Sequence, residues 1–296
     1  MENVLLAVPN VSEGRDQTTV EAIGAAFAAD GKVRLLDTHS DGDHHRSVFT
    51  LAGGPGALGD ALLRGARVAV GGIDIGDGRD RPEIGQHPHV GAIDVVPVVY
   101  LDEGARGAAC AQALVVADRI GEELNVPVLL YGELAGGRTR AELRRGGVAG
   151  LAGRIAAGEL HPDFGPSHPH PSAGVTLVAA RPPLVAFNLQ LAPGAIVADA
   201  RRIASLIREG GSEGLPGLRA IGVELGGGVA QVSMNIERPF EMTLATVVAA
   251  VRRHAEVANA ELVGLAPRSA LEDFPDEVQF VGLNPEKQVI ENILAV

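Results

Sequence analysis

Two histidines lie close together in the stretch GQHPHVGAIDVVP, residues 85–97, where a polar loop gives way to an apolar run. The run over residues 92–101 is rich in β-branched residues and predicts a mostly buried strand. Pro88 stiffens the backbone between His87 and His89. Because imidazole has an ordinary pKa of about 6.5, a histidine held at this junction can both give and take a proton near neutral pH.

Further histidines cluster with aspartates in the stretch LLDTHSDGDHHRSVFT, and this cluster raises metal binding as a second kind of chemistry. The chain has no H-E-x-x-H helix and no cysteine pair. His44 and His45 are adjacent, so in an extended strand they would point to opposite faces. We therefore expect no resident metal, and a metal-dependent hydrolase stays as an alternative. The residues that would serve it are His39, His44, His45, His87, His89, Asp37, Asp41 and Asp43.

The segment VPNVSEGRD, residues 8–16, ends the first expected strand and enters the first expected helix. Two interpretations remain open for its polar side chains. Ser12 and Asp16 are residue types that cap helix N-termini, which makes the segment structural in the first interpretation. In the second, Asn10, Ser12 and Glu13 project from the strand end into a cleft and bind a ligand.

Three other features each have a structural interpretation. The loop DFGPSHPHPSAG, residues 163–174, is rich in proline and is either a linker or a rigid wall around a ligand.

GPGALG, residues 54–59, matches the dinucleotide pattern G-x-G-x-x-G, but the strand before it is entered through a hairpin-like loop. We therefore interpret its glycines as packing positions at a helix start. Cys110 lies among alanines of an expected helix and is interpreted as a core residue.

Composition limits the class of protein. The chain has 296 residues and a formal net charge of −12, which argues against nucleic-acid binding because phosphate recognition needs a basic face. It has no uninterrupted apolar run of about 18 residues, so we expect no membrane segment. The N-terminus lacks a basic start and a cleavage site, and we expect a strand there, not a signal peptide. A single cysteine excludes an internal disulfide and predicts a cytoplasmic protein.

The expected elements repeat one order, strand-helix-strand-strand-helix-strand, in each half of the chain. This order predicts an α+β fold with two ferredoxin-like (βαββαβ) subdomains packed through their sheets, residues 1–172 and residues 173–296. The second half has an extra leading strand, and the linker is expected between about 158 and 173. Expected helices cover residues 16–29, 56–70, 104–124, 196–209 and 242–257. Expected strands cover residues 4–9, 33–38, 46–52, 92–101, 126–131, 174–180, 184–191, 217–225, 229–236 and 260–265.

Three stretches, VPNVSEGRD, DHHRSVFTLAG and GQHPHVGAIDVVP, resemble the formiminotransferase family. The resemblance continues in order along essentially the whole chain, and such serial agreement is more specific than any single motif. The deaminase domain fused to the animal members has no counterpart here, so the chain resembles the stand-alone microbial form. The further matching stretches are VPVLLYGE (126–133), PDFGPSHPHPSAG, AFNLQL (186–191), AQVSMNI (230–236), LVGLAP (262–267) and FVGLNPEKQVIENIL (280–294).

The resemblance implies transfer of a formimino group from N-formimino-L-glutamate to N5 of tetrahydrofolate, the co-substrate, in histidine degradation. It also implies a homodimer and a folate tunnel between the two halves. His87 would be the catalytic acid and base, because the tetrahedral intermediate must lose a proton from one nitrogen and gain one on the other. The positions that match the family's folate loop are Gly165, Pro166, Ser167, Pro171, Ser172 and Gly174.

Three positions depart from residues common in that family. His89, His45 and His39 stand where many members have Arg, Asn and Asp, respectively. An arginine beside the catalytic histidine would bind a substrate carboxylate through two hydrogen bonds, which a histidine cannot do, so we expect Arg46 to hold that carboxylate. The departures leave the exact donor open. A paralogue acting on another folate adduct, such as 5-formyltetrahydrofolate, and a folate-binding protein without turnover remain alternatives.

Overall fold

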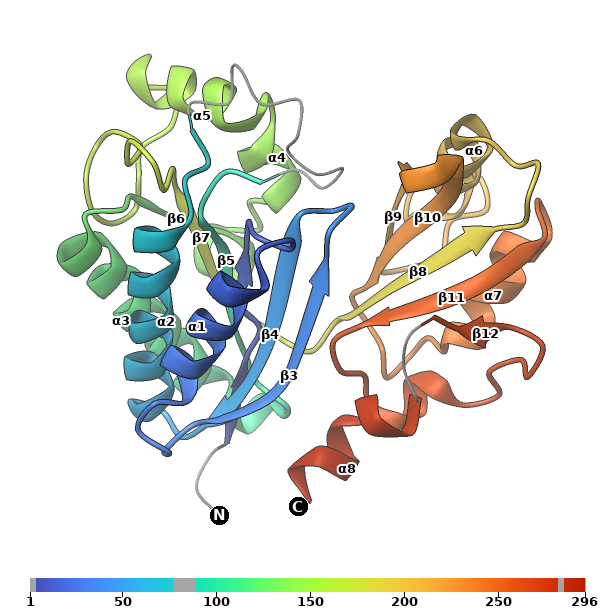
Figure 1. Cartoon of the computed structure of the whole chain (residues 1–296), viewed down its shortest axis with the longest axis horizontal. Helices are drawn as coiled ribbons and strands as arrows, with labels where there is room; N and C mark the ends of the chain where they lie inside the picture. The colour runs from blue at the N-terminus through green and yellow to red at the C-terminus, as the bar shows by residue number, and fades with distance from the viewer. Residues whose placement is uncertain (1–3, 77–88, 282–284, 296) are drawn as a thin grey trace. The chain divides into compact units, whose positions relative to one another are not determined.

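The computed structural model describes residues 4–76, 89–281 and 285–295, and it divides the chain into two compact units, Met1–Pro182 and Pro183–Val296. Each unit contains a β-sheet with helices packed against it, so the chain is an α+β protein with two sheets (Figure 1). In the part of the chain that the structure describes, no helix is both long and apolar enough to cross a membrane.

The sheet of the first unit has seven strands: β1 (Leu5–Ala7), β2 (Asn10–Val11), β3 (Arg34–Asp41), β4 (Arg46–Gly53), β5 (Ile93–Val99), β6 (Val128–Leu130) and β7 (Thr176–Arg181). β1 and β2 both lie between β4 and β5, because each of them pairs with both neighbours. Only β1 lies within the expected strand over residues 4–9, and β2 follows directly after it. The break includes Pro9, which has no N–H to donate and whose carbonyl accepts a hydrogen bond from Phe49 N at 3.0 Å.

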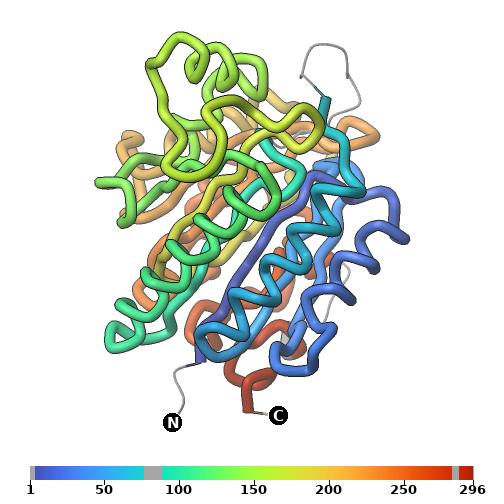
Figure 2. Tube along the Cα trace, turned by 90° about the vertical axis from the view of Figure 1, so that its left-hand side faces the viewer, coloured from blue at the N-terminus to red at the C-terminus, as the bar shows by residue number. Residues whose placement is uncertain are grey.

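Three helices cover one face of this sheet: α1 (Gln17–Ala28), α2 (Ala57–Gly72) and α3 (Arg106–Leu124). Figure 2 looks onto this helical layer. The apolar spacing predicts all three helices, and the structure confirms that Val20, Ile23 and Phe27 of α1 are buried. Phe27 packs so closely on α2 that a β-carbon on Gly65 would lie 2.1 Å from its ring. A larger residue than glycine would therefore separate α1 from α2.

Two shorter helices, α4 (Arg140–Arg144) and α5 (Gly147–Ala156), pack on the opposite face through a separate apolar cluster. The apolar spacing of the sequence does not predict them. α4 has little more than one turn and begins with a capping box between Thr139 and Glu142, and α5 is rich in glycine, which lowers helix propensity. The apolar cluster contains Val90, Val95, Leu129, Tyr131, Leu143, Leu151, Ile155, Val175, Leu177 and Ala179.

β7 belongs to the first sheet, where it lies parallel to and between β5 and β6. The expectation that this strand leads the second half is therefore wrong, because a local sequence pattern predicts a strand but not its partners. The expected linker, about 158–173, is also wrong, because Phe164 and Ala173 are hydrogen-bonded to the first unit. The compact units divide between Pro182 and Pro183, later than the expected limit between residues 172 and 173.

The sheet of the second unit has the order β12-β11-β8-β10-β9, and its strands are β8 (Val185–Leu191), β9 (Leu218–Leu225), β10 (Val229–Ile236), β11 (Val257–Val263) and β12 (Gln279–Phe280). Two helices cover one face through a single apolar core: α6 (Val197–Ile207) and α7 (Leu244–Arg252). A short helix, α8 (Ile290–Leu294), follows. α7 ends before residue 257, where the expected helix ended, because Val257 already pairs with Leu191 of β8.

Candidate active site

His87 lies in residues 77–88, outside the described residues, but the residues that flank this segment are described. On one side, Ile75 N donates a hydrogen bond to Ser172 O at 2.9 Å. On the other side, Val90 O accepts from Val175 N, also at 2.9 Å. The expected folate loop therefore holds both flanks of the segment that carries the predicted catalytic histidine, although these parts are far apart in the sequence.

Glycines make this close approach possible. Gly174 has a φ of 66°, and a β-carbon there would lie 2.3 Å from Val90 O and 2.5 Å from Ile75 Cδ1. At Gly91 a β-carbon would lie 2.2 Å from Val175 O. Both positions therefore require glycine, Gly174 also because its backbone conformation is left-handed.

The loop over residues 163–174 is attached to the rest of the first unit by hydrogen bonds and close backbone contacts. Its end is closed by two backbone hydrogen bonds between His170 and Gly174, of 2.9 and 3.0 Å, and His170 Nδ1 accepts from Ala173 N at 3.0 Å. At its start, Gly165 has a φ of 76°, and a β-carbon there would lie 2.8 Å from the Cα of Gly121 in α3. Of the remaining predicted folate residues, Ser167 and Pro171 are exposed and Pro166 and Ser172 are partly buried.

The structure brings Ser12 to the same place, beside the flank of the histidine segment. Ser12 is 5% exposed, and its Oγ donates to Gly91 O at 2.7 Å. Asn10 Nδ2 donates to Val8 O at 2.9 Å, and Glu13 Oε1 accepts two backbone N–H groups of its own turn. Asp16, and not Ser12, caps α1. These hydrogen bonds shape the end of β2 and support the structural interpretation of the segment.

The early histidines do not form a metal site in the described part of the chain, where no group of three His, Cys, Asp or Glu side chains is placed to hold an ion. His44 is buried, and its Nε2 lies 3.8 Å from Asp41. His45 lies instead against the β2 turn, where its Nδ1 accepts from Gly14 N at 3.3 Å. Burial raises the pKa of Asp37 on β3, and nearby His39 partly offsets this effect.

Asp94 is a buried charge that the sequence analysis missed. It is 2% exposed on β5, where its Oδ1 accepts from Val90 N at 2.7 Å and its Oδ2 pairs with Arg144 Nη2 of α4. A carboxylate inside the apolar run AIDVVP is a signal that could have found it, because a buried charge requires a partner. Asp94 thus links Arg144 of α4 to Val90, which flanks residues 77–88.

Arg46, at the start of β4, lies in the field of this ion pair. Burial, followed by repulsion from Arg144 and Arg140, lowers its pKa to about 10, against the attraction of Asp94. The guanidinium therefore stays charged at neutral pH. Among the described residues it has no hydrogen-bond acceptor and no ion-pair partner within contact distance. Such a group can bind a carboxylate without first giving up another partner.

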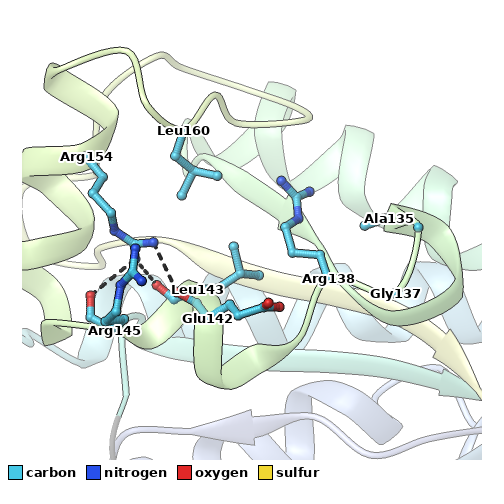
Figure 3. Close-up of a pocket in the computed structure, with 9 residues that line it drawn as sticks. Ala135, Gly137, Arg138, Glu142, Leu143, Arg145, Arg154 and Leu160 are labelled. Atoms are coloured by element: carbon cyan, nitrogen blue, oxygen red, sulfur yellow. Dashed lines mark hydrogen bonds between the residues drawn. The ribbon is translucent and has the colours of Figure 1, made fainter.

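A cavity of about 470 Å³ lies beside α4, and Figure 3 shows the residues that line it. Arg154 crosses it to donate hydrogen bonds to the carbonyls of Glu142 and Arg145, at 3.0 and 3.3 Å, and to that of Leu143. Arg138 pairs with Asp163 at 2.6 Å, immediately before the folate loop. Both arginines are already engaged, Arg154 with carbonyls of α4 and Arg138 with Asp163, so we interpret the cavity as part of the scaffold around the site and not as its centre.

The fold and the site together define an α+β protein in which the flanks of a histidine segment and a glycine-proline loop meet where β5 and β7 begin, beside the arginine that pairs with Asp94. Residues 4–181 match the family model of the formiminotransferase domain, N-terminal subdomain. The chain belongs to the formiminotransferase family, and the resemblance seen in the sequence is confirmed.

Relatives match along the whole chain. A glutamate formimidoyltransferase of Streptococcus pyogenes serotype M1 is 36% identical over 99% of both chains. One of Thermoplasma acidophilum is 33% identical over 90% of this chain and 89% of its own. The formimidoyltransferase-cyclodeaminase of Sus scrofa is 39% identical over 92% of this chain, which corresponds to only 52% of that protein.

Proposed function

We propose that this protein is a glutamate formimidoyltransferase, which moves the formimino group of N-formimino-L-glutamate to N5 of tetrahydrofolate. The observation that carries this function is the agreement over 99% of both chains with the streptococcal glutamate formimidoyltransferase. Tetrahydrofolate is the co-substrate, and the use of N-formimino-L-glutamate as the donor makes this a step of histidine degradation.

His87 is the proposed acid and base of the transfer. N5 of tetrahydrofolate attacks the formimino carbon, and the tetrahedral intermediate then carries an extra proton on N5. The imidazole removes that proton and gives one to the glutamate nitrogen, so that the bond from carbon to this nitrogen breaks. The proposal is supported by the hydrogen bonds that join Ile75 and Val90, the flanks of residues 77–88, to the 172–175 stretch.

The proposed folate contacts come from one loop, and the proposed contacts to the donor come from the β2 turn and β4. The tie between this loop and the flanks of the histidine segment supports placing the two substrates together. The donor residues are Asn10, Ser12, Glu13 and Arg46, and the folate residues are Gly165, Pro166, Ser167, Pro171, Ser172 and Gly174.

We further propose that the two compact units are ferredoxin-like subdomains. In the second unit, the strands of the order β8-α6-β9-β10-α7-β11 lie as β11-β8-β10-β9. The first unit has the corresponding order β5-β1/β2-β4-β3, extended by β7 and β6.

We also propose that the protein is a homodimer in the cytoplasm. The single cysteine is compatible with a reducing compartment, and light scattering checks for twice the chain mass of 30.5 kDa.

A turnover assay with N-formimino-L-glutamate and tetrahydrofolate tests the function, on wild type, His87→Ala and the control His161→Ala. His161 is an exposed histidine outside the loop over residues 163–174. We expect turnover in the wild type and in the control, and a loss of about 10²-fold or more in His87→Ala. Equal rates in all three proteins would exclude His87 as the acid and base. Turnover with 5-formyltetrahydrofolate alone would identify a different donor.

A further inference from the structure

The arginines around Asp94 have more positive charge than the described residues neutralise. Arg144 forms the ion pair with Asp94, and its side chain is only 10% exposed. Arg46 and Arg140 lie in electrostatic range of this pair, and neither has an ion-pair partner within contact distance among the described residues. Asp41 also attracts Arg46, but its effect on the pKa of Arg46 is the smallest of those that act on this group. Two guanidinium charges therefore remain.

Arg140 is held over an aromatic ring that adds a polar group. Its guanidinium carbon lies 5.8 Å from the ring centroid of Tyr131. Tyr131 is 6% exposed, and its hydroxyl has no hydrogen-bond partner in the described structure. Leaving a buried hydroxyl unpaired costs free energy, and an oxygen acceptor bound beside Arg140 would remove that cost. Nε of Arg144 is a second buried donor without a partner.

N-formimino-L-glutamate carries two carboxylates, which matches two uncompensated guanidinium groups. Its α-carboxylate is attached next to the reacting nitrogen, whereas its γ-carboxylate lies at the end of the side chain. Val11 of β2 pairs with Ser47, the neighbour of Arg46, and Ser12 contacts Gly91 beside the histidine segment, so we assign Arg46 to the carboxylate next to the reacting nitrogen. The glutamate of tetrahydrofolate, in contrast, lies at the far end of that molecule from N5.

Resting on the proposed function, we propose that Arg140 of α4 binds the γ-carboxylate of the donor while Arg46 binds its α-carboxylate. Tyr131 donates its hydroxyl to the same γ-carboxylate. Arg144 is a positioning residue, because its ion pair with Asp94 fixes α4 over β5. Through Arg140, α4 would then make the site select a dicarboxylate over its γ-amide.

Binding of two donor mimics that cannot transfer a formimino group tests the proposal. N-acetyl-L-glutamate carries both carboxylates, and N-acetyl-L-glutamine lacks the γ-carboxylate. Isothermal titration would compare wild type, Arg140→Gln, Arg140→Lys and Arg145→Gln. Arg145 is a matched control, because it is an exposed arginine at the C-terminal end of α4 and lines the cavity in Figure 3.

We expect the full-length wild type to bind N-acetyl-L-glutamate about 10-fold or more tightly than the amide, the usual effect of one charged hydrogen-bonded pair. Arg140→Gln should reduce this preference to about twofold, and Arg140→Lys should retain part of it. In turnover, Arg140→Gln should raise KM for N-formimino-L-glutamate by about 10-fold and leave KM for tetrahydrofolate unchanged. Arg145→Gln should behave as the wild type in both assays.

The proposal is overturned if Arg140→Gln keeps the wild-type preference, if Arg145→Gln loses it equally, if only the KM for tetrahydrofolate rises, or if the wild type does not bind N-acetyl-L-glutamate. Its failure is distinguishable from failure of the proposed function. A protein that shows the predicted preferences without formimino transfer has the carboxylate subsite but another reaction. A protein that transfers the group with no effect of Arg140→Gln has the function but not this subsite.

Discussion

Single residues carry the contact between the folate loop and the flanks of the histidine segment, and Gly174 is the one with least conformational freedom. Its φ of 66° already disfavours a side chain, and the nearest atom to an added β-carbon is a backbone oxygen that cannot move away easily. Gly158 has a similar φ of 71° but no atom within 4 Å of that position. Both positions would strain the backbone of a larger residue, but only Gly174 would also cause a steric clash. Comparing the two therefore separates the two effects.

Gly174→Ala is expected to lower the free energy of unfolding by more than about 3 kcal/mol, and Gly158→Ala by about 1 kcal/mol, the strain of a left-handed alanine alone. Urea unfolding measures both. Gly174→Ala should also slow turnover, because it pushes on both flanks of residues 77–88. Equal losses of stability in the two variants would show that the close approach at Gly174 is not tight.

Asp37 provides a residue-scale test that depends on pH. Burial raises the pKa of this carboxyl from its ordinary value of 3.8, so the folded protein holds the proton to a higher pH than the unfolded chain does. Stability is therefore lost as pH rises from 3.8 through the raised pKa, where a buried carboxylate must form. Asp37→Asn should be more stable than the wild type at pH 7, and its advantage should shrink as pH falls towards 4. Parallel curves of unfolding free energy against pH would contradict this.

At the scale of elements, apolar spacing was sufficient wherever a helix is long and covers a sheet. It predicted α1, α2, α3 and α6 within a few residues, because each presents a continuous buried stripe. It failed for α4 and α5, which are held by the Thr139–Glu142 capping box and by the hydrogen bonds of Arg154 to carbonyls of α4. The capping box is local and the Arg154 hydrogen bonds join separate segments, and neither produces a periodic apolar pattern, so apolar spacing alone could not predict the part of the site on α4.

The site itself was predictable in its parts but not in its assembly. The loop 163–174 and the residues around His87 have recognisable composition, whereas the hydrogen bonds from Ile75 and Val90 to the loop depend on sheet pairing. The role of Asp94 could not be predicted for the same reason, because its ion-pair partner Arg144 lies far along the chain.

At the scale of the whole molecule, the unit boundary can be tested by truncation. A fragment of residues 1–182 includes β7 and should unfold cooperatively, because both parallel pairings of that strand are retained. A fragment of residues 1–172 lacks the strand that joins β5 to β6, so it should give a broad transition or aggregate. Circular dichroism during thermal unfolding compares the two. Equal cooperativity would place the boundary at residue 172 after all.

The position of β7 also has a consequence for biosynthesis. Among the described residues, β6 pairs with the other strands of the sheet only through β7, although it leaves the ribosome well before β7. Parallel pairing between such distant segments is slow to form, and until then β5 and β6 offer unpaired backbone groups. A nascent chain that stalls before Thr176 would therefore expose two open strand edges at once, which makes it a substrate for chaperones that capture extended, apolar segments.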